Sequence, residues 1–333
     1  MSLLLLDRAN LEVRAEGDTL VLYEAGARRG TVPIKLVERC VVHGAQTLLS
    51  SGVLLKLAEA GVSTVLMSPR VHRRVAVVLG PQHNDAAVRL AQAHRVMDDS
   101  ACRHWSHSLV SAKLQRQQRA LQHLLRERPD ARKPLWDALQ TLAAIAQTMG
   151  PTTQTLALDT LRGKEGAAAR AYFGGLAGVM PPALEFTGRN RRPPRDPVNV
   201  CLSLGYTLLH SQAIHACQTA GLDPLLGFYH RPTIGRESLA SDLIEPLRPT
   251  VDLWVWELLR NRTLREDHFN TTGGACLLGK AGRAVFYATW ERTSKPLRRW
   301  LRLQTRHLAS QLRNEGLAWI HTDPEPDGEE PAT

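Results

Sequence analysis

Short runs in which apolar and polar residues alternate fill the first 80 residues and predict a small β-rich domain. A turn at Gly17-Asp18 joins two of these runs, and helical apolar spacing over residues 51–60 predicts one helix that ends before Gly61. The predicted strands are residues 3–6, 11–15, 20–23, 31–34, 40–42, 63–67 and 74–79. Strands this short, with one helix packed among them, predict a β-sandwich or roll over residues 1–80.

After residue 80 the spacing of apolar positions changes from that of strands to that of helices. Residues 81–90 begin with turn-forming residues and predict a linker, and residues 91–320 predict a larger, all-α domain. Pro129 and Pro134 are expected to break its first long helical stretch. Residues 283–288 are strand-like, and a last helix is expected to begin at Ser294, with Pro296 in its first turn. The predicted fold class is therefore α+β.

The charge balance points to a polyanionic partner. The chain carries +10, but its acidic tail at residues 321–333, predicted to be disordered, holds five acids and no Lys or Arg, so the preceding body carries +10 + 5 = +15. A body this basic favours nucleic acid, although charge that serves only solubility is an alternative. The apolar run at residues 3–6 is too short for a signal sequence or a membrane span, so we expect a cytoplasmic protein that does not bind membranes.

Several common chemistries have no support in the sequence. The five cysteines are odd in number, scattered and free of CxxC spacing, which argues against a disulfide framework and against structural zinc. The chain also lacks the GxxxxGK[ST], GxGxxG and GxSxG patterns. ATP hydrolysis, dinucleotide binding and serine hydrolase chemistry are therefore not predicted.

One histidine and three acids stand out as candidate chemistry. His230 precedes Asp242 and Glu245, which are three residues apart and so would share one face of a helix that Ser241 is expected to cap. Glu165 is an acid beside the small residues 166–169 and 171, where close packing predicts burial. A buried glutamate must be paired, protonated or bound to a metal.

The same residues have plainer interpretations. The acid pair could be a solvated helix end, and Glu165 could pair with Lys164 or Arg170. As a set, an imidazole and carboxylates suit Mg²⁺ or Mn²⁺, and the single imidazole slightly favours Mn²⁺. Such an ion activates an attacking oxygen and neutralises phosphoryl charge, so a phosphodiester is the natural substrate of so basic a protein.

Two groups of arginines are candidate phosphate contacts. The first group lies around the rigid Pro193-Pro194 pair. Arg248 belongs to neither group. It follows Glu245 by about one turn, where it could hold a carboxylate or a phosphate. The members of the first group are Arg189, Arg191, Arg192 and Arg195. The second group, in the last helix, is Arg298, Arg299, Arg302, Arg306 and Arg313. A basic linker and a solvated helix face are the respective alternatives.

Four long segments, in this order, resemble one family: LRGKEGAAARAYF, FTGRNRRPPRDPVNVCLSLGYTLL, GFYHRP and SLASDLIEPLRPTVD. They are similar to the CRISPR-associated endonuclease and integrase, the universal first subunit of the spacer-acquisition (adaptation) complex. The N-terminal half, including the helix with SAKLQRQQ, is similar more loosely. The resemblance implies a small N-terminal β domain, expected to serve dimerisation, and a larger helical catalytic domain.

The resemblance also implies a site, partners and a reaction. Its metal-binding positions fall on Glu165, His230 and Glu245, and Asp242 matches a neighbouring acid of the catalytic site. Family members form homodimers, two of which flank a dimer of the second acquisition protein in a heterohexamer. The complex joins the 3′-hydroxyls of double-stranded prespacer DNA to the CRISPR repeat by transesterification, in antiviral defence. We also consider a catalytically silent DNA-binding scaffold of the same machinery and an unrelated metallohydrolase for small phosphate esters.

Overall fold

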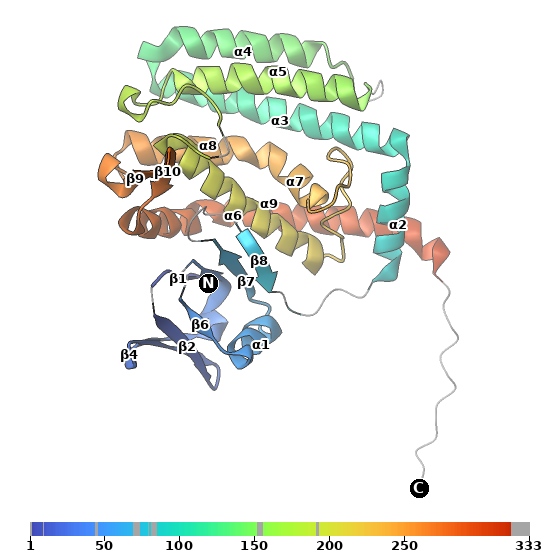
Figure 1. Cartoon of the computed structure of the whole chain (residues 1–333). Helices are drawn as coiled ribbons and strands as arrows, with labels where there is room; N and C mark the ends of the chain where they lie inside the picture. Colours follow the sequence, from blue (N-terminus) through green and yellow to red (C-terminus); the bar gives the residue numbers. More distant parts are fainter. Residues whose placement is uncertain are drawn as a thin grey trace.

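The computed structural model describes residues 2–8, 10–43, 46–68, 74–78, 80, 85–151, 156–190 and 193–320. It confirms the α+β class, with a small β domain below a larger helical domain (Figure 1). The acidic tail and the turn residues 81–84 lie outside the described residues, so the predicted disorder and part of the predicted linker do too.

The N-terminal domain consists of two sheets that pack around one helix. The first sheet has the order β1-β5-β7-β8, with β8 antiparallel to β7, and the second has the order β4-β3-β2-β6. Alternating side chains of both sheets and of α1 bury a shared core that includes Leu20, Cys40 and Val53. The elements are β1 (Ser2–Leu6), β2 (Leu11–Glu16), β3 (Thr19–Glu24), β4 (Ala27–Pro33), η1 (Ile34–Leu36), β5 (Val37–Val42), β6 (Leu48–Leu49), α1 (Ser51–Glu59), β7 (Ser63–Met67) and β8 (Arg74–Val78).

The helical domain begins after β8 and buries a second, larger core. Its first half comprises α2 (Ala86–Met97), α3 (Asp99–Glu127), η2 (Pro129–Ala131), α4 (Arg132–Gln147), α5 (Leu158–Ala177), η3 (Pro182–Leu184) and α6 (Pro197–Thr219). Its second half comprises α7 (Ser238–Ile244), η4 (Glu245–Leu247), α8 (Arg248–Arg260), η5 (Glu266–His268), β9 (Phe269–Thr272), β10 (Ala275–Leu278), α9 (Lys280–Gly316) and η6 (Leu317–Trp319). Figure 1 shows α6 and α9 between the N-terminal domain and the layer of α3, α4 and α5.

Two predictions about the last helix are wrong. Residues 283–288 form no strand, and the helix does not start at Ser294, because α9 runs from Lys280 through Pro296 to Gly316. An internal proline costs a helix about 3 kcal/mol. Buried side chains on both sides of it, Trp290 and Leu301 among them, offset that cost by fixing one continuous apolar face. Of the two other prolines, Pro129 separates α3 from α4 as predicted, whereas Pro134 lies in the first turn of α4 and breaks nothing.

Charged pairs join the two domains. Arg283 of α9 donates to Asp7 from Nε at 3.0 Å, and Arg39 of β5 donates to Glu291 of α9 at 3.2 Å. The five cysteines are free and buried, as predicted for small apolar side chains. No helix within the described ranges is long and apolar enough to cross a membrane.

Candidate functional site

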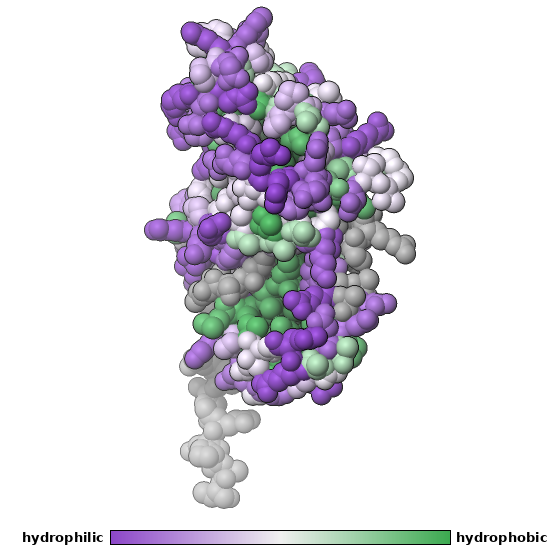
Figure 2. Space-filling model, turned by 90° about the vertical axis from the view of Figure 1, so that its left-hand side faces the viewer, coloured by the Kyte–Doolittle hydropathy of each residue, from purple (hydrophilic) through white to green (hydrophobic). Residues whose placement is uncertain are grey.

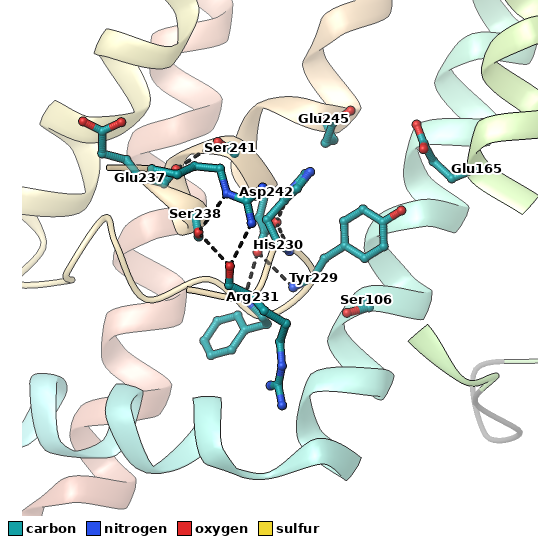
Figure 3. Close-up of polar contacts among 12 residues, drawn as sticks. Ser106, Glu165, Tyr229, His230, Arg231, Glu237, Ser238, Ser241, Asp242 and Glu245 are labelled. Carbon is teal, nitrogen blue, oxygen red and sulfur yellow. Dashed lines mark hydrogen bonds and ion pairs between the residues drawn. The ribbon is translucent and has the colours of Figure 1, made fainter. Parts of the chain in front are cut away.

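The loop that carries His230 is wrapped around the carboxylate of Asp242. Oδ2 of Asp242 accepts hydrogen bonds from the backbone N–H groups of Phe228 (2.8 Å) and Tyr229 (3.1 Å). Oδ1 accepts from the backbone N–H of His230 (2.9 Å) and from its ring Nδ1 (2.6 Å) (Figure 3). This close approach needs Gly227, where a Cβ would lie 2.6 Å from the backbone of Ser238.

The fully buried Asp242 fixes the tautomer of His230. Because the carboxylate accepts from Nδ1, the proton sits on Nδ1 and the lone pair of Nε2 is left for another partner. Burial raises the pKa of Asp242, and the hydrogen bonds from His230 and the backbone work against that rise. The sequence placed Asp242 among the catalytic residues, and its geometry here is that of a residue that orients His230.

Ser241 does not cap the helix of the acid pair, contrary to the prediction. α7 begins at Ser238, so Ser241 lies inside it and donates back to the carbonyl of Glu237 at 2.9 Å. The helix then tightens into η4 at Glu245, which changes the rotation between the two acids. Asp242 faces the His230 loop. In Figure 3, Glu245 lies apart from Asp242 and His230, toward α5, the helix that carries Glu165.

Glu165 of α5 and Glu245 converge on one cation, the ammonium group of Lys113 on α3. Nζ of Lys113 donates to Oε1 of Glu165 and, at 2.6 Å, to Oε2 of Glu245. Arg248 holds the other oxygen of Glu245 at 3.1 Å. Although burial raises the pKa of Glu245, Arg248 and Lys113 outweigh it and hold this pKa at about 2. Glu245 is therefore ionised at neutral pH.

Among the ion pairs of the described residues, Glu165 pairs with Lys113 and with neither Lys164 nor Arg170. Lys164 donates to the hydroxyl of Thr148 at 2.6 Å, and the side chain of Glu165 is 22% exposed rather than buried. Sequence reasoning missed Lys113 altogether. One feature of the sequence could have indicated it: Lys113 stands four residues after Leu109 and next to Leu114, on the apolar face of α3. A lysine buried there without a partner would cost stability.

The side chains of Glu165, Glu245 and His230 have the chemistry needed to bind a divalent metal ion. Two carboxylates already surround one cation, and in the nearby imidazole the hydrogen bond at Nδ1 leaves the lone pair of Nε2 to bind a metal ion. Within the described ranges, however, no three His, Cys, Asp or Glu side chains form a ready-made ligand set. The structure thus brings Glu165 to Glu245 and His230 to Asp242, and Lys113 occupies the place between the two carboxylates.

The arginines near the site have structural partners. Arg189 donates to Oδ1 of Asn199 at 2.5 Å and to Ser203 at 3.1 Å, which anchors the loop to the start of α6. Arg189 and Arg248 both stack on the ring of Tyr206, at 5.3 and 4.8 Å. Arg248 therefore holds a carboxylate, one of the two roles anticipated for it.

The remaining DNA-contact predictions are untested. Arg195 is exposed, and Arg191 and Arg192 lie outside the described residues. A cavity of about 40 Å³ lies beside Glu165, and Lys113, Arg189 and Arg248 line it together with Tyr206 and Asp252. Its three cations place positive charge next to the carboxylates, where a phosphoryl group would need it.

One part of the wall of this cavity is a buried acid, Asp252, that two tyrosines hold. Asp252 accepts hydrogen bonds from Tyr172 at 3.0 Å and from Tyr206. Burial raises the pKa of Asp252 to about 6, although both hydroxyls act to lower it. The group fixes Tyr206, and through it the two stacked arginines.

This fold matches the solved structures of a casposase and of a Cas1 protein. A casposase bound to its integration product has a TM-score of 0.82 at 22% identity, covering 95% of this chain and 91% of that chain. A Cas1 protein from Thermotoga maritima has a TM-score of 0.80 at 20% identity, covering 94% and 97%.

Sequence comparison then identifies the family. The family model described as "CRISPR associated protein Cas1" matches residues 4–292. The CRISPR-associated endonuclease Cas1 1 of Thermodesulfovibrio yellowstonii is 32% identical over 293 residues, 87% of this chain and 91% of that protein. Cas1 2 of Rhodospirillum rubrum is 37% identical over 299 residues, 86% and 84%. The chain belongs to the Cas1 family, as its motifs predicted.

Proposed function

We propose that this chain is a divalent-metal-dependent DNA endonuclease and integrase that inserts captured DNA fragments into a CRISPR array as new spacers. The matched relatives are named endonucleases, and the casposase structure contains an integration product. The observation that carries the proposal is the pairing of Glu165 and Glu245 around one cation, beside an imidazole that Asp242 orients.

Glu165, His230 and Glu245 are the residues that would hold Mg²⁺ or Mn²⁺. When bound, the ion supplies charge neutralisation at the phosphoryl group and favours the deprotonated form of the attacking oxygen. Arg248 keeps Glu245 ionised and in place, and Asp242 keeps the His230 proton on Nδ1. Lys113, once released from the carboxylates, can neutralise phosphate charge from the adjoining 40 Å³ cavity that it lines.

The proposed joining reaction is a transesterification. The 3′-hydroxyl oxygen of the captured fragment attacks a phosphorus atom of the repeat and loses its proton, the bond to the leaving sugar oxygen breaks, and that oxygen takes up a proton. One phosphodiester is formed for each one broken, so the step requires no ATP. This agrees with a sequence that lacks a phosphate-binding loop of the GxxxxGK[ST] type. Hydrolysis by the endonuclease follows the same course with water as the attacking group.

A strand-transfer assay tests this proposal. It combines prespacer DNA, repeat DNA and the second acquisition protein with Mn²⁺, Mg²⁺ or EDTA. We expect Glu165→Gln, His230→Ala and Glu245→Gln to abolish joining, while Glu257→Gln, at an exposed acid of α8, leaves it unchanged. Circular dichroism checks that each variant is folded. Full joining in EDTA, or by the His230→Ala protein, would refute the proposal.

A DNA-binding scaffold is the second candidate, and one observation favours it. Lys113 already neutralises both carboxylates, as it would in a purely structural ion-pair cluster. A scaffold would bind DNA tightly and with strong salt dependence, yet show no Mn²⁺-dependent strand transfer. Turnover of a generic phosphate ester without DNA would instead favour a small-molecule hydrolase.

We further propose that the chain acts as a homodimer within a heterohexamer that contains the second acquisition protein. A Cas6-RT-Cas1–Cas2 complex has a TM-score of 0.79 over 94% of this chain, at 21% identity. Figure 2 shows apolar side chains gathered over the lower part of the molecule, where Figure 1 places the N-terminal domain. A large exposed apolar area favours an interface. Light scattering after size exclusion tests this, and a monomeric mass at micromolar concentration would contradict it.

A further inference from the structure

A second, larger cavity lies between the two domains, away from the metal-site residues. Its volume is about 410 Å³, within the range of roughly 300–1,000 Å³ typical of ligand pockets. The N-terminal domain contributes η1, the start of β5 and the end of α1, and the helical domain contributes α6 and α9. Apolar side chains form part of its wall: Ile34, Val37, Ala60, Ala216 and Ala220.

Positive charge dominates the rest of this wall. The described residues that line the cavity include five cations and no acid: Lys35, Arg39, Arg298, Arg302 and Arg306. Glu291 pairs with Arg39 at 3.2 Å and with Arg298 at 3.0 Å. In the part of the chain that the structure describes, Lys35, Arg302 and Arg306 have no acidic partner. Several positive charges that line a concave surface without counter-ions attract anions strongly.

The three arginines of α9 form a row. Arg298, Arg302 and Arg306 are four residues apart, so they follow one face of the helix at steps of about 6 Å. Other arginines of α9 do not line the cavity: Arg313 pairs with Asp85 at 3.1 Å, and Arg299 is exposed. Arg302 and Arg306 are exposed as well, so their face of the helix borders a cavity that is open to solvent. A row of guanidinium groups matches phosphate geometry and can follow a nucleic-acid backbone.

We propose that this interdomain cavity binds the phosphate groups of a nucleotide, either free or within a DNA single strand. Arg302 and Arg306 contact the phosphates from α9, and Lys35 contacts them from the N-terminal domain. The apolar wall accommodates the sugar or base. Phosphate fits better than the carboxylates of an acidic peptide, because one phosphate offers several oxygens to two neighbouring guanidinium forks. The site needs no metal ion, so it does not depend on the proposed catalytic centre.

Two matched double variants test the proposal. Arg302→Glu/Arg306→Glu changes the cavity, and Arg292→Glu/Lys295→Glu makes the same charge change at two positions of the same helix that do not line it. Binding is measured in EDTA, by calorimetry with deoxyadenosine 5′-monophosphate and deoxyadenosine, and by fluorescence anisotropy with a labelled ten-nucleotide single strand. We expect the cavity variant to lose at least about tenfold in affinity for the phosphate-bearing probes, and the control less than about twofold. Loss of two phosphate contacts should lower the salt slope for the strand by about 1.4.

The outcomes separate the sources of phosphate. Selective loss with both phosphate probes supports a site that accepts free nucleotides, and selective loss with the strand alone supports a DNA-strand site. Equal losses in both double variants would overturn the proposal, as would an acidic peptide that binds the cavity when neither phosphate probe does. Arg302→Ala/Arg306→Ala replaces the charge-reversed pair if that pair fails to fold. Glu165→Gln should keep nucleotide binding while losing strand transfer, so failure of one proposal is distinguishable from failure of the other.

Discussion

Replacing Asp242 with Asn tests how the His230 loop is held. Each carboxylate oxygen of Asp242 accepts two hydrogen bonds, Oδ2 from the N–H groups of Phe228 and Tyr229, and Oδ1 from the N–H and Nδ1 of His230. An amide has one acceptor oxygen. At the Oδ2 position the NH₂ group faces two backbone N–H donors, so two hydrogen bonds are lost. At the Oδ1 position it faces the N–H of His230, which is lost as a hydrogen bond, and a ring nitrogen that can accept only after a change of tautomer.

The expected loss of stability follows from these contacts. An unsatisfied buried donor costs about 1–3 kcal/mol, so the loss is about 1–3 kcal/mol when the NH₂ group faces the ring and the tautomer changes, and about 2–6 kcal/mol when it faces the two backbone donors. That is a large part of the 5–15 kcal/mol typical of a domain. Asp159→Asn is the matched control, because the side chain of Asp159 is 94% exposed and, among the described residues, its one ion pair is with Arg162. Its loss should be at most about 1 kcal/mol. Urea unfolding measures both.

The orientation of the new amide decides the tautomer of His230. If its NH₂ group faces the ring, Nδ1 must accept, so the proton moves to Nε2 and removes the lone pair available to a metal ion. Nitrogen NMR of the ring then shows the switch, and Mn²⁺ affinity should fall by about 10–100-fold. An Asp242→Asn protein with the stability of the Asp159→Asn control, an unchanged tautomer and unchanged Mn²⁺ affinity would refute this reasoning.

Three further outcomes are expected. Lys113→Met breaks a buried ion pair and should cost about 3–5 kcal/mol in EDTA, whereas Lys133→Met, at an 86% exposed surface pair, should cost under about 1 kcal/mol. Saturating Mn²⁺ should raise the melting temperature of Lys113→Met more than that of wild type, and an equal rise would contradict the view that Lys113 occupies the ion's place. The pKa of Glu245 is depressed from 4.5 to about 2, so its contribution to stability is complete above pH 4.5 and is lost as pH falls toward 2. The stability difference between wild type and Glu245→Gln should shrink over that range, and a difference constant with pH would show that Glu245 is not held in its ionised form.

The sequence by itself determined the order of the two domains and named most residues of the candidate site. Strand-like alternation before residue 80 and helical spacing after it are local signals, because each depends on neighbours one to four residues away. The segments around Glu165, His230 and Glu245 were also recognisable as a linear series of motifs. Local signals failed in α9, where burial along both halves of the helix carried it through Pro296.

Only the tertiary structure decided how these residues pair. Lys113 lies 52 residues from Glu165 and 132 from Glu245, and no periodicity links such distances. The acid pair three residues apart was expected to share a helix face, but the change from α7 to η4 directs Asp242 to the His230 loop and Glu245 to Lys113 and Arg248. Likewise, the arginines of α9 look alike in sequence. Packing of the N-terminal domain against α6 and α9 selects the three that face the interdomain cavity.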